Sequence, residues 1–144
     1  MQVSGIKVLP LLAATVAIYL TGFVIYGLIT PSETWMLWSN ISAEDMERIG
    51  MSRMPLSVLM PIMIAIGVAL VIKWRKVDSM GSGAVTGLLM ALFFLVGGRL
   101  YGYVYGVEGI NILMLDSAHL MLNGLAAGAV LGGWSNRSYV DDAS

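Results

Sequence analysis

Four long runs of apolar residues alternate with polar stretches along this chain. The runs cover residues 8–29, 55–72, 81–103 and 110–134. An α-helix rises about 1.5 Å per residue, so a run of about 20 residues crosses the roughly 30 Å hydrocarbon layer of a membrane. The pattern therefore predicts one all-α domain over residues 1–144, an integral membrane four-helix transmembrane bundle.

The longest polar stretch, residues 31–54, is expected to be an outer loop. Trp35 and Trp38 lie three residues apart directly after the first run. Indole side chains favour the headgroup layer, so we expect a short interfacial helix here. Ser42 followed by Asp45 is typical of a helix start, because the hydroxyl can accept from a free backbone amide. Trp74 and Trp134 close two of the other runs and are expected to anchor them at the membrane interface.

Composition supports lipid as the solvent of these helices. The chain is 58% hydrophobic and 12% charged, with a mean hydropathy of +0.82. A soluble fold of this size could not hide so much apolar surface. The net charge of -1 and the scattered cations argue against nucleic-acid binding. The absence of cysteine excludes disulfides, thiolate metal sites and cysteine nucleophiles.

The basic residues indicate an orientation. Lys7, Lys73, Arg75, Lys76 and Arg137 fall on one side of the membrane, and Arg48 and Arg53 on the other. Cytoplasmic segments carry an excess of Lys and Arg, so both termini are expected in the cytoplasm and the first loop outside. The first run is longer than the core of a cleaved signal, so we expect it to remain as a span.

A polar stripe crosses one face of the fourth run. Asp116, His119 and Asn123 are spaced i, i+3 and i+7, within about 60° on a helix. Arg99 near the end of the third run and Tyr26 near the end of the first reach a similar depth. We predict that these five side chains gather in the outer half of the bundle. They form either a ligand, ion or proton site or a purely structural lock. A single histidine does not make a metal site, so no metal or cofactor is expected.

Glycines recur at intervals of four. The residues that form these series are Gly83, Gly87, Gly98, Gly102, Gly106, Gly124, Gly128 and Gly132. Small residues at this spacing form flat ridges where two membrane helices approach closely. The ridges serve packing inside one bundle or a contact between subunits, and the sequence leaves both possibilities open.

Two other chemistries have weaker support. Met51 with Met54, and Met60 with Met63, have a spacing that could present thioethers to Cu(I). Methionine is more often a gap-filler in apolar packing. Ser117 lies near His119 and Asp116, but Ser117 and His119 point about 160° apart on a helix, which argues against a hydrolase triad.

The end of the first run and the end of the last resemble a known family. The residues that carry the resemblance are Tyr26, Gly27, Leu28, Ile29 and Trp35, then Gly128, Leu131, Gly132, Gly133 and Trp134. They are similar to the small bacterial membrane family catalogued as domain of unknown function seventeen sixty-one. The resemblance implies a four-helix protein of the bacterial inner membrane and supplies no activity.

The sequence as a whole predicts a non-enzymatic protein with the lipid bilayer as its surroundings. We expect a small membrane subunit or scaffold that self-associates as a homo-oligomer, or docks onto other membrane subunits, through its glycine-rich helix faces. The alternative is a small transporter, channel or ligand-binding membrane protein that uses Arg99, Asp116 and His119.

Overall fold

The computed structural model describes residues 2–3 and 6–135, and these residues are almost entirely helical. A short antiparallel pair of strands, β1 and β2, precedes the first helix. The elements at this part of the chain are β1 (Gln2–Val3), β2 (Ile6–Lys7), α1 (Val8–Gly22), the π-helical η1 (Phe23–Ile29), α2 (Ser32–Ser39) and α3 (Ala43–Arg53). The remaining elements are the 3-10 turn η2 (Met54–Val58), α4 (Leu59–Trp74), α5 (Met80–Met90), the π-helical η3 (Ala91–Val96), α6 (Gly97–Tyr105) and α7 (Ile110–Ser135).

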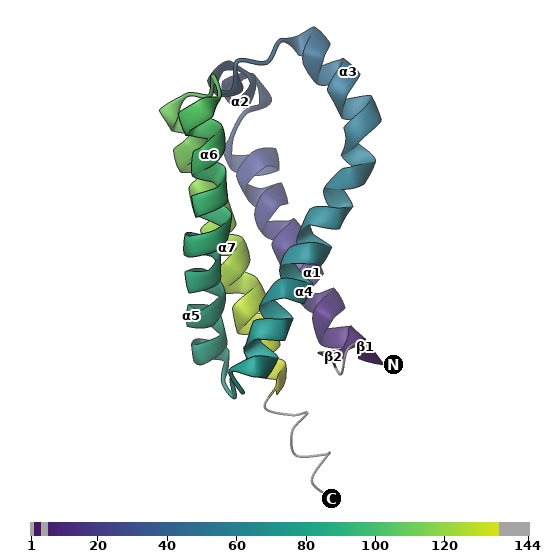
Figure 1. Ribbon diagram of the computed structural model, residues 1–144. Coiled ribbons are helices and arrows are strands. Elements are labelled where there is room, and N and C mark those ends of the chain that lie inside the picture. Colours follow the sequence, from purple (N-terminus) through teal and green to yellow (C-terminus); the bar gives the residue numbers. More distant parts are fainter. Residues whose placement is uncertain (1, 4–5, 136–144) are drawn as a thin grey trace, which may run out of the picture.

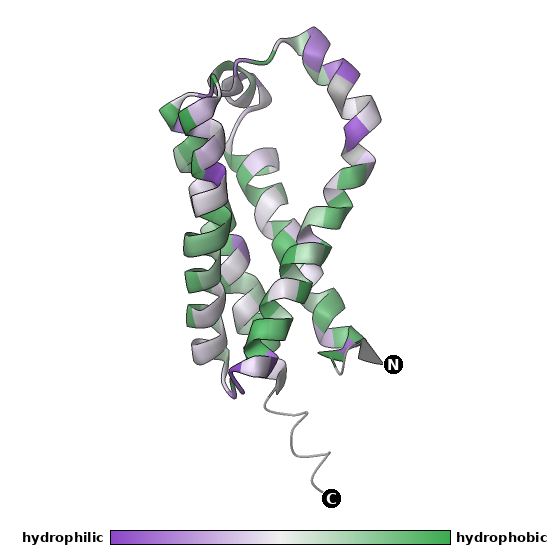
Figure 2. Ribbon diagram, viewed as in Figure 1, coloured by the Kyte–Doolittle hydropathy of each residue, from purple (hydrophilic) through white to green (hydrophobic). Residues whose placement is uncertain are grey.

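Four helical stretches are long and apolar enough to cross a membrane, so the predicted four-helix architecture is confirmed. They cover Val8–Ile29, Pro55–Trp74, Met80–Tyr105 and Ile110–Trp134. The second span continues two residues past its predicted end to Trp74, and the third begins one residue earlier and ends two residues later than predicted. The α4 helix ends where Lys76 takes a positive φ of 52°. Figure 2 shows the spans mainly in hydrophobic colours, with polar colours on α3, at the α4–α5 turn and at a few positions within the spans.

The α7 helix lies at the centre of the bundle, against α1, α4 and α5. One end of the bundle holds the N-terminal strands and the α4–α5 turn, and we call it the terminal end (Figure 1). The other holds α2 and the α6–α7 connection, and we call it the α2 end. An apolar core of mostly small and β-branched residues joins α1, α4 and α7, and its members are Ala14, Ile18, Ala65, Val68, Ala69, Ile72, Val77, Ala127 and Leu131.

The glycines of α5 and α7 bring the backbones of these two helices into close contact. A Cβ atom added at Gly83 would lie 2.8 Å from the Cα of Gly132, and one at Gly87 would lie 2.8 Å from the carbonyl carbon of Gly124. Gly128 meets the backbone of Gly83 in the same way. Only glycine permits this separation, since any side chain would overlap the opposite backbone. These five glycines therefore pack inside the bundle and do not form a contact between subunits.

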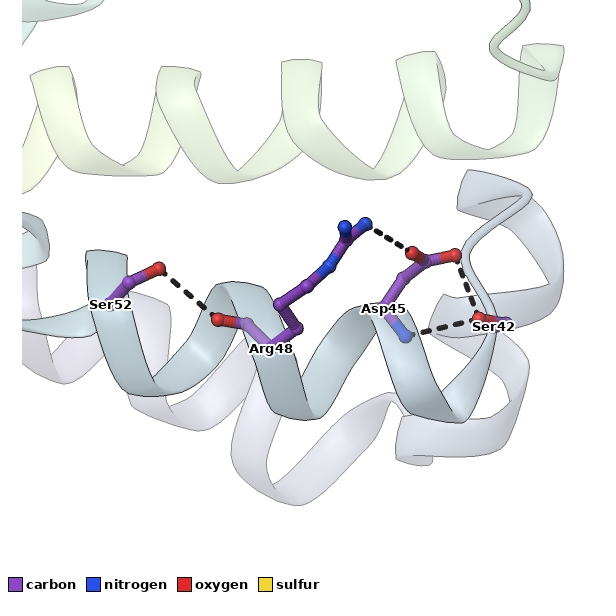
Figure 3. Close-up of polar contacts among 4 residues, drawn as sticks. All are labelled: Ser42, Asp45, Arg48 and Ser52. Atoms are coloured by element: carbon purple, nitrogen blue, oxygen red, sulfur yellow. Dashed lines mark hydrogen bonds and ion pairs between the residues drawn. The ribbon is translucent and has the colours of Figure 1, made fainter.

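The α3 helix lies away from the other helices of the bundle and chiefly contacts η2, the element that follows it (Figure 1). Its first turn is closed as the sequence predicted: the Ser42 hydroxyl accepts from the Asp45 backbone N–H at 3.0 Å and donates to the Asp45 carboxylate at 2.7 Å. Arg48 donates to the other oxygen of Asp45 at 2.7 Å, and Ser52 donates to the Arg48 carbonyl (Figure 3). Local hydrogen bonds thus maintain α3 where tertiary packing is sparse.

Candidate functional site

Asp116 is the centre of a polar cluster that joins three of the four spans. The Arg99 Nε donates to Asp116 Oδ2 at 2.5 Å, and the Tyr26 hydroxyl donates to Asp116 Oδ1 at 2.5 Å. Tyr26 belongs to η1, Arg99 to α6 and Asp116 to α7. Both carboxylate oxygens are therefore satisfied by short hydrogen bonds, one of which is assisted by opposite charges. The arrangement offsets part of the cost of keeping ions at membrane depth.

Arg99 also forms an ion pair with Glu108. Glu108 lies in the connection between α6 and α7 and folds back over the end of α6. Gly102 leaves the room for this pair, because a Cβ at that position would lie 2.7 Å from Arg99 Nη1 and 3.4 Å from Glu108 Oε2. The Arg99 guanidinium thus pairs with two carboxylates. It can do so because it is planar and carries five N–H donors.

His119 and Asn123 extend the cluster toward the middle of α7. The Asn123 Nδ2 lies 3.0 Å from His119 Nε2, and the Asn123 Oδ1 contacts the hydroxyl of Thr21 on α1. The rings of Tyr26 and His119 meet edge to face, with centroids 4.9 Å apart and planes at 84°. Gly22 gives His119 its space, since a Cβ there would lie 3.2 Å from Nε2. Asn123 is the largest fully buried side chain among the described residues, at 2% exposure.

The structure brings together all five residues that the sequence singled out, Tyr26, Arg99, Asp116, His119 and Asn123. Sequence reasoning missed Glu108 and Thr21, which we include with the five in the term polar cluster. Glu108 is the acidic residue of the short connection beside Arg99, and that proximity was the available signal. Tyr19 lies seven residues before Tyr26 on the first span, but it is exposed and outside the polar cluster. The π-helical η1 changes the angular register between the two tyrosines.

The other candidate residues lie outside the polar cluster. Trp35 and Trp38 are on α2, the predicted interfacial helix, and Trp74 is exposed at the end of α4. Trp134 lies near the end of α7 and lines a surface pocket together with Met80, Val130 and Gly133. Met60 and Met63 are exposed on α4, while the side chains of Met51 and Met54 lie outside the described ones. Among the described residues, no group of three or more His, Cys, Asp or Glu side chains could hold a metal ion.

Two glycines of α6 remain without close neighbours. A Cβ atom at Gly97 or Gly98 would meet nothing within 4 Å among the described atoms. By contrast, Gly102 accommodates Arg99 and Gly106 lies against the carbonyl of Gly102 at the end of α6. The Gly98, Gly102 and Gly106 series therefore does not form one continuous ridge against another helix of this chain.

Comparison with known proteins gives one match. The model of a family described as "Protein of unknown function (DUF1761)" matches residues 9–132. No curated protein and no solved structure matches the chain.

Proposed function

The chain belongs to the DUF1761 family of proteins of unknown function, and from that membership and the geometry of the bundle we propose that it is a small, non-enzymatic membrane subunit. It self-associates, or docks onto a larger membrane complex, through a glycine-containing helix face. A multi-pass protein with four spans provides the frame for such a role.

The observation that carries this proposal is the outward face of η3 and α6. Phe94, Gly98, Tyr101 and Tyr105 are spaced i, i+4, i+7 and i+11, and all of them are exposed. Tyr101 and Tyr105 pack on each other with ring centroids 4.7 Å apart. We call these four residues the Gly98 face. A notch between aromatic side chains lets a second helix approach closely and gives it large rings to pack against.

A second copy of the chain is the partner that best suits the Gly98 face. In a two-fold dimer the same patch meets itself, so the Gly98 notch of one protomer lies against that of its partner. The equivalent glycines of α5 and α7 are already occupied inside the bundle. The Gly98 face is therefore the part of the glycine pattern that remains available to another chain.

Substitution of Gly98 tests the proposal. Gly98→Leu fills the notch and should weaken self-association about tenfold, which corresponds to about 1.4 kcal/mol. Gly67→Leu is the matched control, because a Cβ at Gly67 in α4 also meets nothing within 4 Å. Subunit counting by single-molecule photobleaching in liposomes provides the measurement, with a dye on one introduced cysteine in a chain that has none. Equal dimer fractions for wild type and Gly98→Leu would exclude this face as the interface.

We also propose that the protein resides in a bacterial inner membrane with both termini in the cytoplasm. Lys7, Lys73, Arg75 and Lys76 lie at the terminal end, whereas Arg48 and Arg53 lie on α3, toward the α2 end (Figure 1). The fifth cation counted on the terminal side, Arg137, is outside the described residues. The positive-inside tendency supports this orientation.

A second candidate function, a small transporter, channel or ligand-binding protein, is favoured by the polar cluster. Arg99 and Asp116 retain 20% side-chain exposure, so the ion pair is within reach of a small ligand. Asp116→Asn separates the two roles, because it removes the charge and keeps the shape. Normal assembly with lost flux or ligand binding supports the second candidate. Impaired assembly, with no flux or ligand affinity even in the wild type, supports the subunit role.

A further inference from the structure

The hydrogen-bond chemistry between His119 and Asn123 depends on a proton. The side-chain nitrogen of asparagine only donates, so the 3.0 Å contact from Asn123 Nδ2 to His119 Nε2 is a hydrogen bond only when Nε2 carries no hydrogen. Thr21 holds the amide in this orientation, because its hydroxyl contacts Asn123 Oδ1. The geometry therefore corresponds to a neutral His119 with its proton on Nδ1.

Uptake of a proton at Nε2 would place two donors opposite each other in this arrangement. A half-turn of the Asn123 amide removes the conflict, since Oδ1 then accepts from the Nε2–H of His119. In that orientation Asn123 Nδ2 donates to the Thr21 oxygen. The Thr21 hydroxyl keeps a partner as well, because it also lies 2.7 Å from the Ile18 carbonyl and donates to it. In both protonation states the contacts from His119 to Asn123 and from Asn123 to Thr21 are thus hydrogen bonds within the same backbone, which a buried polar network requires.

We propose that His119 is a reversible proton-binding site reached from the α2 end of the bundle, and that the Asn123 amide turns over when Nε2 gains or loses its proton. The inference deepens the second candidate function, on which it rests, by naming the proton as the ligand. The proton comes from water and binds the lone pair of Nε2, and no bond between heavy atoms forms or breaks.

Graded burial supports access from one end. Glu108 in the α6–α7 connection is 34% exposed and Asp116 is 20% exposed, whereas Asn123 is 2% exposed. Beyond Asn123 toward the terminal end, α7 continues into the apolar core with Ala127 and Leu131. This gradient places the more exposed side of the polar cluster at Glu108 and its closed side at the apolar core, so we assign proton entry to the α2 end.

The charged and titratable groups around His119 lie on η1, α6, α7 and the α6–α7 connection. Tyr26 of η1 contacts its ring, and Asp116 lies one turn away on α7. Arg99 of α6 and Glu108 of the connection bind one another beyond Asp116. Without His119 these groups sum to one negative charge, from two carboxylates and one guanidinium. An imidazolium at His119 would bring the formal charge of the cluster to zero.

The chain has a single histidine, so nitrogen NMR of histidine-labelled protein in lipid nanodiscs reports on His119 alone. We expect the pattern of a bare Nε2 and a protonated Nδ1 at high pH, and a doubly protonated ring at low pH. The side-chain amide signals of Asn123 should change with the same midpoint. A ring that stays in one state between about pH 4 and pH 9, or an Asn123 amide that does not follow the ring, would overturn the proposal.

Asn123→Asp adds a carboxylate acceptor of the same shape beside Nε2. The doubly protonated ring should then persist to a pH higher by about one unit, a tenfold change in proton affinity. Asn111→Asp is the matched control, because Asn111 is exposed on the same helix three turns away and should leave the midpoint unchanged. Equal shifts in both variants would contradict a local role of Asn123. If Asn123→Asp does not fold, the wild-type titration still decides. A flux assay separately tests the transporter or channel function. Failure of proton binding at His119 is therefore distinguishable from failure of the second candidate function.

Discussion

Arg99 forms ion pairs with two carboxylates from different parts of the chain. It binds Asp116 on α7 and Glu108 in the connection before that helix. A cation is costly at membrane depth unless opposite charges and hydrogen bonds surround it, so each of the three residues depends on the other two. Conversely, removal of the shared cation leaves two like charges close together.

Replacement of Arg99 by methionine should therefore destabilise the bundle. Arg99→Met keeps the length of the side chain but leaves Asp116 and Glu108 without their cation. We expect a loss of about 2 kcal/mol of unfolding free energy, because the pair is mostly but not completely buried. Unfolding with SDS in mixed micelles provides the measurement. Arg53→Met, at an exposed position of α3, is the control, and an equal effect of both variants would contradict the assigned role.

Asp45 provides a residue-scale prediction outside the membrane. The hydroxyl of Ser42 donates to its carboxylate and, with Arg48, holds the pKa of Asp45 below its usual value. A lowered pKa means that the contribution to the first turn of α3 is present above the unfolded pKa of about 4 and is lost as pH falls through the folded pKa. Ser42→Ala should raise the pKa of Asp45 toward its usual value.

Carboxyl carbon NMR of Asp45 during a pH titration measures this shift. Ser52→Ala is the matched control, because Ser52 donates to the Arg48 carbonyl instead of to Asp45 (Figure 3). An unchanged titration in Ser42→Ala would show that Ser42 does not set the pKa.

At the scale of helices, the contact between α5 and α7 depends on glycine. The two backbones approach so closely that Gly87 and Gly124 each exclude a side chain on the other helix. Glycine lowers helix propensity in an element interior, but the close approach compensates through van der Waals packing. The repeated spacing in the sequence predicted close approach, and the structure determined that α5 and α7 are the partners.

Gly87→Ala should separate these helices. Its Cβ would lie 2.8 Å from the Gly124 carbonyl carbon and 3.1 Å from the Gly128 Cα, both of them backbone atoms that cannot move aside locally. We expect a net loss of about 1 to 3 kcal/mol, the usual cost of overpacking. Gly81→Ala on the same helix is the control, since its Cβ would meet nothing within 4 Å and alanine favours the helix. Thermal unfolding in detergent distinguishes the two variants, and equal melting temperatures would refute close packing at Gly87.

For the whole molecule, the distribution of basic residues predicts which end of the bundle faces which compartment. The chain has no cysteine, so a single introduced cysteine is the only thiol that a maleimide can label. Ala43→Cys at the start of α3 and Asp78→Cys in the α4–α5 turn are both at exposed positions. In intact cells a membrane-impermeant maleimide should label the first and spare the second. The reverse pattern would place the termini outside.

The sequence by itself determined that the chain forms four membrane-spanning helices, where each lies, and which polar residues avoid lipid. It could do so because hydrocarbon thickness fixes the length of a span and the cost of an unpaired ion fixes the face on which it lies. It also predicted that Tyr26, Arg99, Asp116, His119 and Asn123 would gather, since their depths along the helices agree.

Only the tertiary structure decided which partners each group finds. Glu108 and Thr21 join the polar cluster because the α6–α7 connection folds back and α1 rotates against α7, and periodicity within one helix carries no information about such rotations. The π-helical η1 likewise moves Tyr19 away from the face that Tyr26 occupies. Identical glycine spacings receive different roles for the same reason: Gly87 packs on α7, Gly102 accommodates an ion pair and Gly98 stays open. Each role depends on what lies opposite, and that is a property of the assembled bundle.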